Sequence, residues 1–238
     1  LPLAMAHEID LWQFIAWRLK NGEPVMLLVV AESSGSSPGR AGYKMAVAAD
    51  GELIGSIGGG VMEVRLVEQA KIIIQNSRSK IGSEVIEQVH QKNSPQSSGM
   101  ICSGKQTVIF RLLAPDDSET VATVIDALRH RTGAFLTITL TRFDVGPPED
   151  GIKNDDFHFE KNSDDEFYYH EKLGAKNELY IIGGGHCALA LSELMSKMDF
   201  HIRIFDDRPE LNTLDKNRFA DGIEIVNSYD DIPDHIPS

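Results

Sequence analysis

The order of apolar and polar positions predicts alternating helices and strands over the first 142 residues. Residues 7–20 place their apolar side chains on one helical face, and Gly22 supplies a helix stop. Residues 25–30 form a continuous apolar run, which is typical of a buried strand. The same patterns predict hairpin strands at residues 43–49 and 52–57 around Asp50-Gly51, helices at residues 60–76 and 116–130, and strands at residues 81–90, 106–113 and 134–141.

Two details of this pattern concern how the predicted elements pack. Residues 32–42 contain too much glycine and serine for regular structure, so we expect a loop there. In the helix at residues 60–76, the apolar side chains available for burial are Val61, Val64, Val67 and Ile72.

Two glycine-rich stretches each lie between a predicted strand and a predicted helix. The first is Gly58-Gly59-Gly60, followed one helical turn later by Glu63, and the second is Gly183-Gly184-Gly185. Glycine permits a tight turn that gathers backbone N–H groups, and the N-terminus of a helix adds partial positive charge. We therefore expect both turns to bind anionic groups such as phosphates, with Glu63 as a charged cap of the first helix.

The second glycine turn opens a strand–helix–strand pattern that is typical of dinucleotide-binding domains. Residues 179–182 predict a buried strand, and a second strand at residues 201–205 leads to Asp206 and Asp207. Asp206 follows Ala188, the third small position of the motif, by 18 residues. This spacing suits a carboxylate that bonds the 2′-hydroxyl of an adenine ribose. A turn that only packs helix against strand is the alternative.

These patterns predict an α/β fold class with an N-terminal α+β domain at residues 1–142, an acidic segment at 143–178 and a Rossmann-like βαβ domain at 179–238. The acidic segment has 11 acidic side chains against 4 lysines between residues 144 and 178, and it is expected to be a solvated linker or a small hairpin. From residue 179 onward there is room for three strands, whereas a complete doubly wound domain has about six. The sequence therefore predicts only the first half of that domain.

Composition excludes several classes of partner. The net charge of −13 predicts repulsion of nucleic acid and anionic lipid. No apolar run approaches the roughly 18 residues that a membrane-spanning helix needs. The only cysteines, Cys102 and Cys187, do not form a disulfide framework, so we expect a cytoplasmic protein that binds neither nucleic acid nor membranes.

Three motifs together resemble the xanthine dehydrogenase accessory-factor family, which includes maturation proteins of carbon-monoxide dehydrogenase. They are Gly35-Ser-Ser-Pro38 with the Asp50-Gly51 hairpin, Gly55-Ser-Ile-Gly-Gly-Gly-Val-Met-Glu63, and Gly183-Gly-Gly-His186 with Phe205-Asp-Asp-Arg-Pro-Glu210. The resemblance implies an N-terminal α+β domain joined to a Rossmann-like domain. It also implies that the protein binds molybdenum cofactor of the molybdopterin type and, after a sulfur ligand is installed, hands it to a xanthine dehydrogenase-type molybdenum hydroxylase. Such a protein is a chaperone without catalytic residues, rather than a turnover enzyme.

Molybdenum cofactor combines a pterin, a phosphate tail and an oxo-metal head, so a carrier needs anion donors and a soft ligand. Cys102 lies in a loop flanked by glycine and serine and is the candidate for a molybdenum contact; an ordinary buried cysteine is the alternative. Val61 and Met62 stand where some family members carry a cysteine after the glycine turn. The candidate cofactor-binding residues are Ser36, Arg40, Gly58, Gly59, Gly60, Glu63, Cys102, Gly183, Gly184, Gly185, His186, Asp206 and Asp207.

The expected partners are a molybdenum hydroxylase, a sulfur-donor protein and a second copy of the chain in a homodimer. NAD(P) is a further expected ligand of the second glycine turn. Two other functions stay open at this point. One is an NAD(P)-dependent oxidoreductase that uses the Rossmann-like domain, and the other is a non-catalytic interaction module of the hydroxylase assembly in which both turns are structural.

Overall fold

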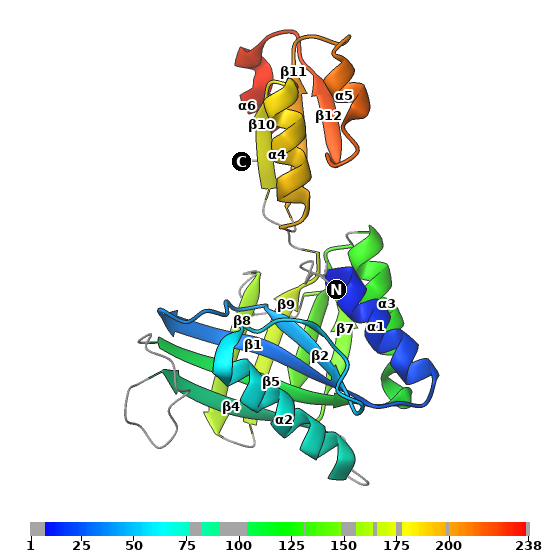
Figure 1. Ribbon diagram of the computed structural model, residues 1–238, viewed down its shortest axis with the longest axis vertical. Coiled ribbons are helices and arrows are strands. Elements are labelled where there is room, and N and C mark those ends of the chain that lie inside the picture. Colours follow the sequence, from blue (N-terminus) through cyan, green and yellow to red (C-terminus); the bar gives the residue numbers. More distant parts are fainter. Residues whose placement is uncertain are drawn as a thin grey trace. The chain divides into compact units, whose positions relative to one another are not determined.

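The computed structural model describes residues 8–76, 82–90, 104–130, 132–148, 156–163, 166–174, 178–198 and 200–236 (Figure 1). These residues form two compact units, an N-terminal unit at Glu8–Ala175 and a C-terminal unit whose described part begins at residue 178. Helices and strands occur together in both units, so the predicted α/β fold class is confirmed.

The N-terminal unit is built on a five-stranded antiparallel sheet with the order β3-β2-β1-β5-β4 (Figure 1). The central strand pairs with a neighbour on each side, and β2 and β3 form the hairpin predicted around Asp50-Gly51. The strands are β1 (Val25–Gly35), β2 (Lys44–Ala48), β3 (Leu53–Gly55), β4 (Ser83–His90) and β5 (Gly104–Leu113).

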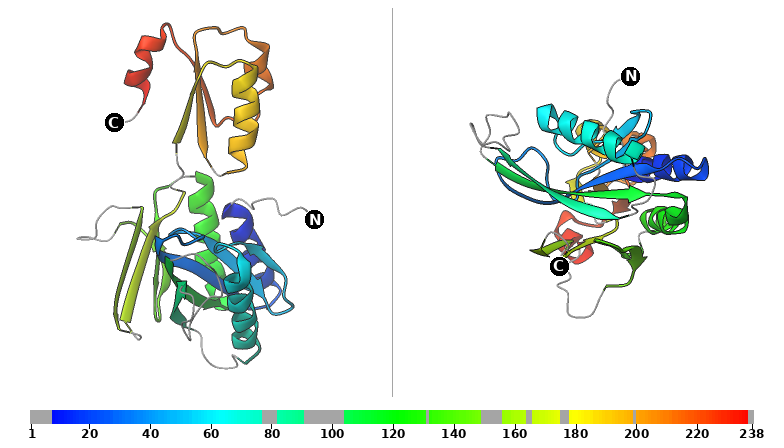
Figure 2. Two further views of the ribbon diagram at one scale, coloured as in Figure 1. Left: turned by 60° about the vertical axis from the view of Figure 1, so that its left-hand side comes forward. Right: turned by 90° about the horizontal axis from the view of Figure 1, so that it is seen from below.

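One face of this sheet is covered by helix α2 (Gly60–Asn76), as the right-hand view of Figure 2 shows. Met26 and Leu28 of β1 belong to the same buried cluster as Met62 and Leu66 of α2. Side chains alternate along a strand, so the intervening residues of β1 point to the opposite face.

The opposite face is covered by helices α1 (Glu8–Lys20) and α3 (Ser118–His130) and by a four-stranded antiparallel sheet with the order β7-β6-β9-β8. Leu27 and Val29 of β1 share this second cluster with Trp12 of α1 and Leu136. The acidic segment at residues 143–178 supplies three of the four strands of this sheet. Its strands are β6 (Phe135–Thr139), β7 (Phe143–Gly146), β8 (Phe157–Ser163) and β9 (Glu166–Lys172), and a short 3-10 helix, η1 (Pro115–Asp117), precedes α3.

Two packing expectations for the N-terminal unit are wrong. Strand β1 continues to Gly35, into the segment expected to be a loop, because residues 104–107 of β5 pair with this glycine- and serine-rich stretch. On α2, Val67 is buried as predicted, but Val61, Val64 and Ile72 are 51%, 63% and 57% exposed. The helix instead turns the side containing Met62, Leu66, Val67, Ala70 and Ile74 toward the sheet.

The C-terminal unit contains a three-stranded parallel sheet with the order β10-β11-β12 (Figure 2). The strands predicted at residues 179–182 and 201–205 are confirmed, each one residue longer, β12 is the third strand for which the sequence has room, and the described residues add no fourth strand to this sheet. Because the strands are parallel, residues 183–186, 206–210 and 226–229 all follow at the carboxyl edge of the sheet. The elements are β10 (Glu178–Ile182), α4 (His186–Ser196), β11 (His201–Asp206), α5 (Asn212–Lys216), β12 (Gly222–Ile225), η2 (Tyr229–Asp231) and α6 (Ile232–His235).

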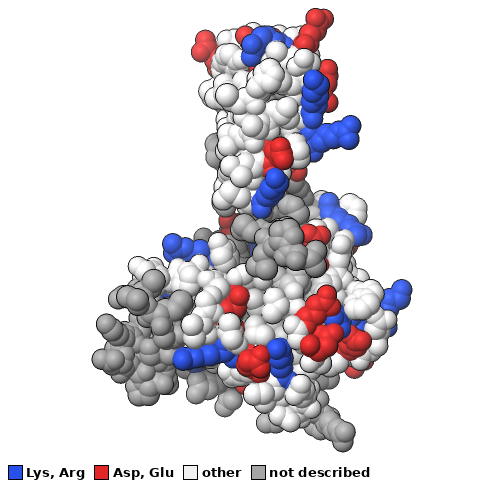
Figure 3. Space-filling model, viewed as in Figure 1, with Lys and Arg blue, Asp and Glu red and all other residues white. Residues whose placement is uncertain are grey.

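Acidic and basic side chains are interspersed on the face of the molecule drawn in Figure 3. None of the helices in the described ranges is both long enough and apolar enough to cross a bilayer.

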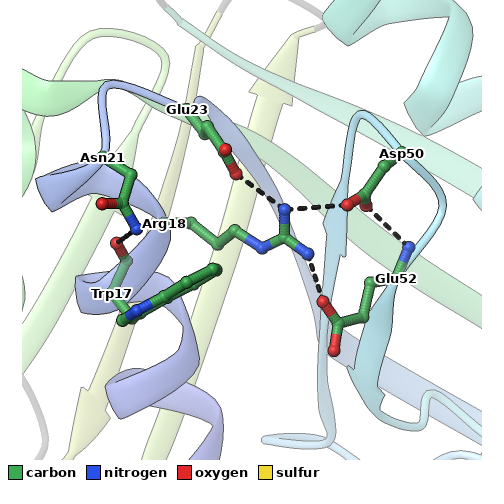
Figure 4. A network of polar contacts seen from close by, with 6 residues as sticks. All are labelled: Trp17, Arg18, Asn21, Glu23, Asp50 and Glu52. Carbon is green, nitrogen blue, oxygen red and sulfur yellow. Dashed lines mark hydrogen bonds and ion pairs between the residues drawn. The ribbon is translucent and has the colours of Figure 1, made fainter.

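Arg18, near the end of α1, ties this helix to the β2–β3 hairpin (Figure 4). Its Nη1 donates to Glu23 at 2.6 Å and to Asp50 at 2.9 Å, and its Nη2 donates to Glu52. The residue is only 5% exposed, and its guanidinium also lies over the ring of Trp17. A planar, forked donor is therefore required where three carboxylates converge.

We expect Arg18→Lys to lower the free energy of unfolding by about 1–3 kcal/mol, because lysine keeps the charge but cannot bond the three carboxylates with two separate nitrogens. Denaturant unfolding measures the change. Arg129→Lys is the matched control, since Arg129 is exposed at the end of α3, and its effect should stay within about 0.5 kcal/mol. Equal losses in the two variants would contradict a special role for Arg18.

Candidate functional site

The first glycine turn joins β3 to α2 through a backbone that only glycine adopts readily. Gly58, Gly59 and Gly60 have φ values of +124°, +75° and +74°, all in the region that L side chains avoid. The sequence Gly-Gly-Gly is therefore a requirement of this turn.

Glu63 folds back onto the first turn and takes up its donors. Its Oε2 accepts hydrogen bonds from the N–H groups of Ile57 at 2.9 Å and Gly59 at 3.0 Å, and from the Ser56 hydroxyl at 2.7 Å. The Gly58 N–H donates to the Ser56 hydroxyl oxygen at 3.2 Å. The N–H groups of Gly58 and Gly59 thus have partners within the chain, the Ser56 hydroxyl and the Glu63 carboxylate.

Three glycine-containing segments pack together around this turn. A Cβ atom on Gly39 would lie 2.2 Å from the carbonyl oxygen of Ile57, and one on Gly58 would lie 2.6 Å from the backbone nitrogen of Gly39. A Cβ atom on Gly104 would lie 2.7 Å from the backbone nitrogen of Ser37. Contacts this close leave no room for side chains at these glycines. The segment around Gly39, the first glycine turn and the start of β5 therefore form one cluster.

Gln106 of β5 is fully buried and connects two parts of this cluster by hydrogen bonds. Its Oε1 accepts from the Ser37 hydroxyl at 3.0 Å, and its Nε2 donates to the Ile57 carbonyl at 2.7 Å. The sequence did not lead us to expect this role. The sequence feature that could have indicated this role is a single glutamine in a largely apolar strand, because a buried amide needs hydrogen-bond partners for both its oxygen and its nitrogen.

The outer surface of the cluster carries the remaining candidates of the N-terminal unit. Ser36, Arg40 and Gly60 are exposed, so a hydroxyl and a guanidinium are available to an anion from solvent. Cys102 lies outside the described residues, two positions before Gly104 in the chain. Within the described ranges, no group of three or more metal-binding side chains is found.

The second glycine turn joins β10 to α4 and is held from inside by another carboxylate. Gly183 has a φ of +97°, and a Cβ atom on Gly184 would lie 2.2 Å from the Leu214 side chain. The Gly184 N–H donates to Asp206 at 2.5 Å, and its carbonyl accepts from Thr213 at 2.5 Å. Gly183 is thus needed for its backbone conformation and Gly184 for close packing, while Gly185 has open space around it.

Asp206 and Asp207 follow each other in sequence but lie in opposite environments. Asp206 is fully buried, and besides Gly184 its oxygens accept three hydrogen bonds from Arg208 between 2.8 and 3.0 Å. Arg208, together with the Gly184 N–H, outweighs the effect of burial and lowers the pKa of Asp206 to about 2. The Asp207 side chain is 43% exposed. The carboxylate predicted by spacing to meet a ribose therefore holds the turn, and only its neighbour reaches solvent.

His186 and Cys187 begin α4 and are exposed. The N–H groups of a first helical turn have no partner within their own helix, so this end of α4 is open to an acceptor. The two glycine turns belong to different compact units, and each is a candidate site in its own right.

Removal of the Glu63 carboxylate should destabilise the N-terminal unit by about 1–2 kcal/mol, because three donors lose their acceptor. Denaturant unfolding of Glu63→Ala measures this loss. Glu68→Ala is the control on the same helix, since Glu68 is exposed and pairs with Lys71 at 2.8 Å, and it should cost about 0.5 kcal/mol or less. A Glu63→Ala variant as stable as the control would contradict the role of Glu63 as a cap.

Asp206 should make the stability of the C-terminal unit depend on acid pH. The pKa of Asp206 falls from 3.8 in the unfolded chain to about 2 in the folded unit. Its contribution to the free energy of unfolding is therefore present above about pH 4 and is lost as the pH falls toward 2. The contribution should be on the order of 1 kcal/mol, since Arg208 is solvent-screened. Thermal unfolding of Asp206→Asn should lack this part of the pH dependence, whereas Asp207→Asn should retain it.

The comparisons with known proteins agree with the resemblance drawn from the motifs. Residues 18–86 match the sequence model of the XdhC and CoxI family. A crystal structure solved as a xanthine dehydrogenase from Bacillus halodurans has a similar fold, with a TM-score of 0.61 and 20% sequence identity over 98% of this chain and 72% of that chain. None of the curated protein sequences compared with the chain matches it significantly. The resemblance to the xanthine dehydrogenase accessory factors is thus confirmed, and residues 18–86 carry the sequence features of the XdhC and CoxI family.

Proposed function

We propose that the protein is a maturation factor of a xanthine dehydrogenase-type molybdenum hydroxylase, and that it holds molybdenum cofactor for delivery to that enzyme. The observation that carries the proposal is the family match at residues 18–86, which contains the whole loop and the first glycine turn with its Glu63 cap. A chain that holds and transfers a cofactor needs a binding surface rather than a catalytic constellation.

The cluster around the first turn offers donors that suit the anionic end of such a cofactor. Arg40 can pair a phosphate, and the Ser36 hydroxyl can donate a hydrogen bond. The inner N–H groups of Ile57 and Gly59 become available only when Glu63 moves away. The outer donors therefore fit the phosphate tail directly, and Cys102 would supply a soft ligand for the metal. The hydroxylase, a sulfur-donor protein and a second copy of the chain are the partners in this proposal.

Cys102→Ala should weaken binding of molybdenum cofactor by about tenfold or more, because the variant loses the soft ligand. Titration of the full chain with isolated cofactor, followed by native mass spectrometry, measures both affinity and stoichiometry, and we expect one cofactor per chain. Cys187→Ala, in the other unit, is the matched control and should bind like the unmodified protein.

The outcomes separate the parts of the proposal. Full affinity in Cys102→Ala would remove this residue from the site but keep cofactor binding. Absence of binding by the unmodified protein would refute cofactor delivery. Capture of the hydroxylase by such a non-binding protein would then favour the interaction-module alternative.

A second candidate function is binding of a nicotinamide dinucleotide by the C-terminal unit, with or without hydride transfer. Its support is the parallel β10–α4–β11–α5–β12 order, in which a glycine turn, the start of α4 and Asp207 all lie at the carboxyl edge of the sheet. In open α/β sheets, this is the edge where nucleotides bind.

A further inference from the structure

Asp207 and Tyr229 meet at the carboxyl edge of the C-terminal sheet. Asp207 directly follows β11, and Tyr229 follows the adjacent strand β12. The Tyr229 hydroxyl donates to Asp207 Oδ1 at 3.1 Å, and the Tyr229 residue is 40% exposed. Among the described residues, no hydrogen bond is found to the other Asp207 oxygen. The pair therefore presents an oriented, solvent-accessible carboxylate oxygen.

Of the neighbouring charged groups, Arg208 forms its hydrogen bonds with the buried Asp206. Arg208 uses Nε and Nη2 on the buried Asp206, and its Nε lies 3.6 Å from Asp207 Oδ1. With Asp206 neutralised by Arg208, Asp207 remains as a local negative charge, and residues 206–210 contain Glu210 as a further acid. A carboxylate accepts a hydrogen bond from a hydroxyl but repels a phosphate placed at the same point.

We infer that Asp207, positioned by Tyr229, makes the C-terminal unit selective for a nucleotide whose ribose has a free 2′-hydroxyl over one that carries a 2′-phosphate. The inference rests on nucleotide binding, the second candidate function. It assigns the ribose contact to Asp207 rather than to Asp206, and it gives Tyr229 a positioning role that no motif in the sequence indicated. Arg208 donates its Nε and Nη2 hydrogen bonds to Asp206, so the inference does not assign it the contact with the 2′-position.

The test compares 5′-AMP with adenosine 2′,5′-bisphosphate, which differ only in the 2′-phosphate. In calorimetric titrations of the full chain, 5′-AMP should bind at least about tenfold more tightly. Asp207→Asn should weaken 5′-AMP binding by about tenfold and bring the ratio of the two affinities close to one. Tyr229→Phe, which removes only the hydroxyl, should reduce the ratio without lowering the melting temperature. Asp215→Asn removes an exposed acid from α5 of the same unit and should leave the ratio unchanged.

Equal or tighter binding of the bisphosphate by the unmodified protein would overturn the inference while leaving nucleotide binding intact. An unchanged ratio in Asp207→Asn would equally overturn the role of this carboxylate. If neither nucleotide binds, both the inference and the second candidate function fail, whereas the cofactor-delivery proposal for the N-terminal unit is unaffected.

Discussion

The structure of the N-terminal unit depends on covering both faces of strand β1. Residues 25–31 are all buried, with the side chains of one parity under α2 and those of the other under α1, α3 and the second sheet. Each large apolar side chain that leaves water contributes about 1.5–3 kcal/mol, so neither cover can be lost without a large cost. The loop and the first glycine turn are attached to this doubly covered sheet, which gives the candidate site a rigid base.

A buried ionic cluster interrupts the apolar layer on one side of this sheet. Lys44 donates to Glu8 at 2.9 Å and to the nearly fully buried Glu171, which also accepts from the Tyr169 hydroxyl. Burial alone would lower the pKa of Lys44, but the carboxylates of Glu171 and Glu8 outweigh it and raise that pKa. Burial also raises the pKa of Glu171, against the pull of Lys44. Such a cluster disfavours any arrangement of α1, β2 and β9 that would leave one of the charges without a partner.

The two glycine turns share a design that goes beyond their glycines. In each, a carboxylate from the same chain accepts a glycine N–H: Glu63 bonds Gly59, and Asp206 bonds Gly184. A carboxylate of the chain itself thus stabilises each turn, at the place where the sequence pattern predicts an external anion. The groups left for a ligand lie at the rim of each turn: the donors Arg40 and Ser36 at the first, and the acceptor Asp207 at the second.

Sequence alone determined the order of the helices and strands from α1 to β6 and from β10 to β11, and the positions of both glycine turns, because periodicity and backbone sterics are local properties. It also determined that a carboxylate pair would end β11. Only the tertiary structure decided that Val61, Val64 and Ile72 of α2 face solvent, that Gln106 locks the first turn, and that Asp206 is buried while Asp207 is exposed. Alternation along a strand places neighbouring side chains on opposite sides, but which side becomes covered depends on elements far away in the chain.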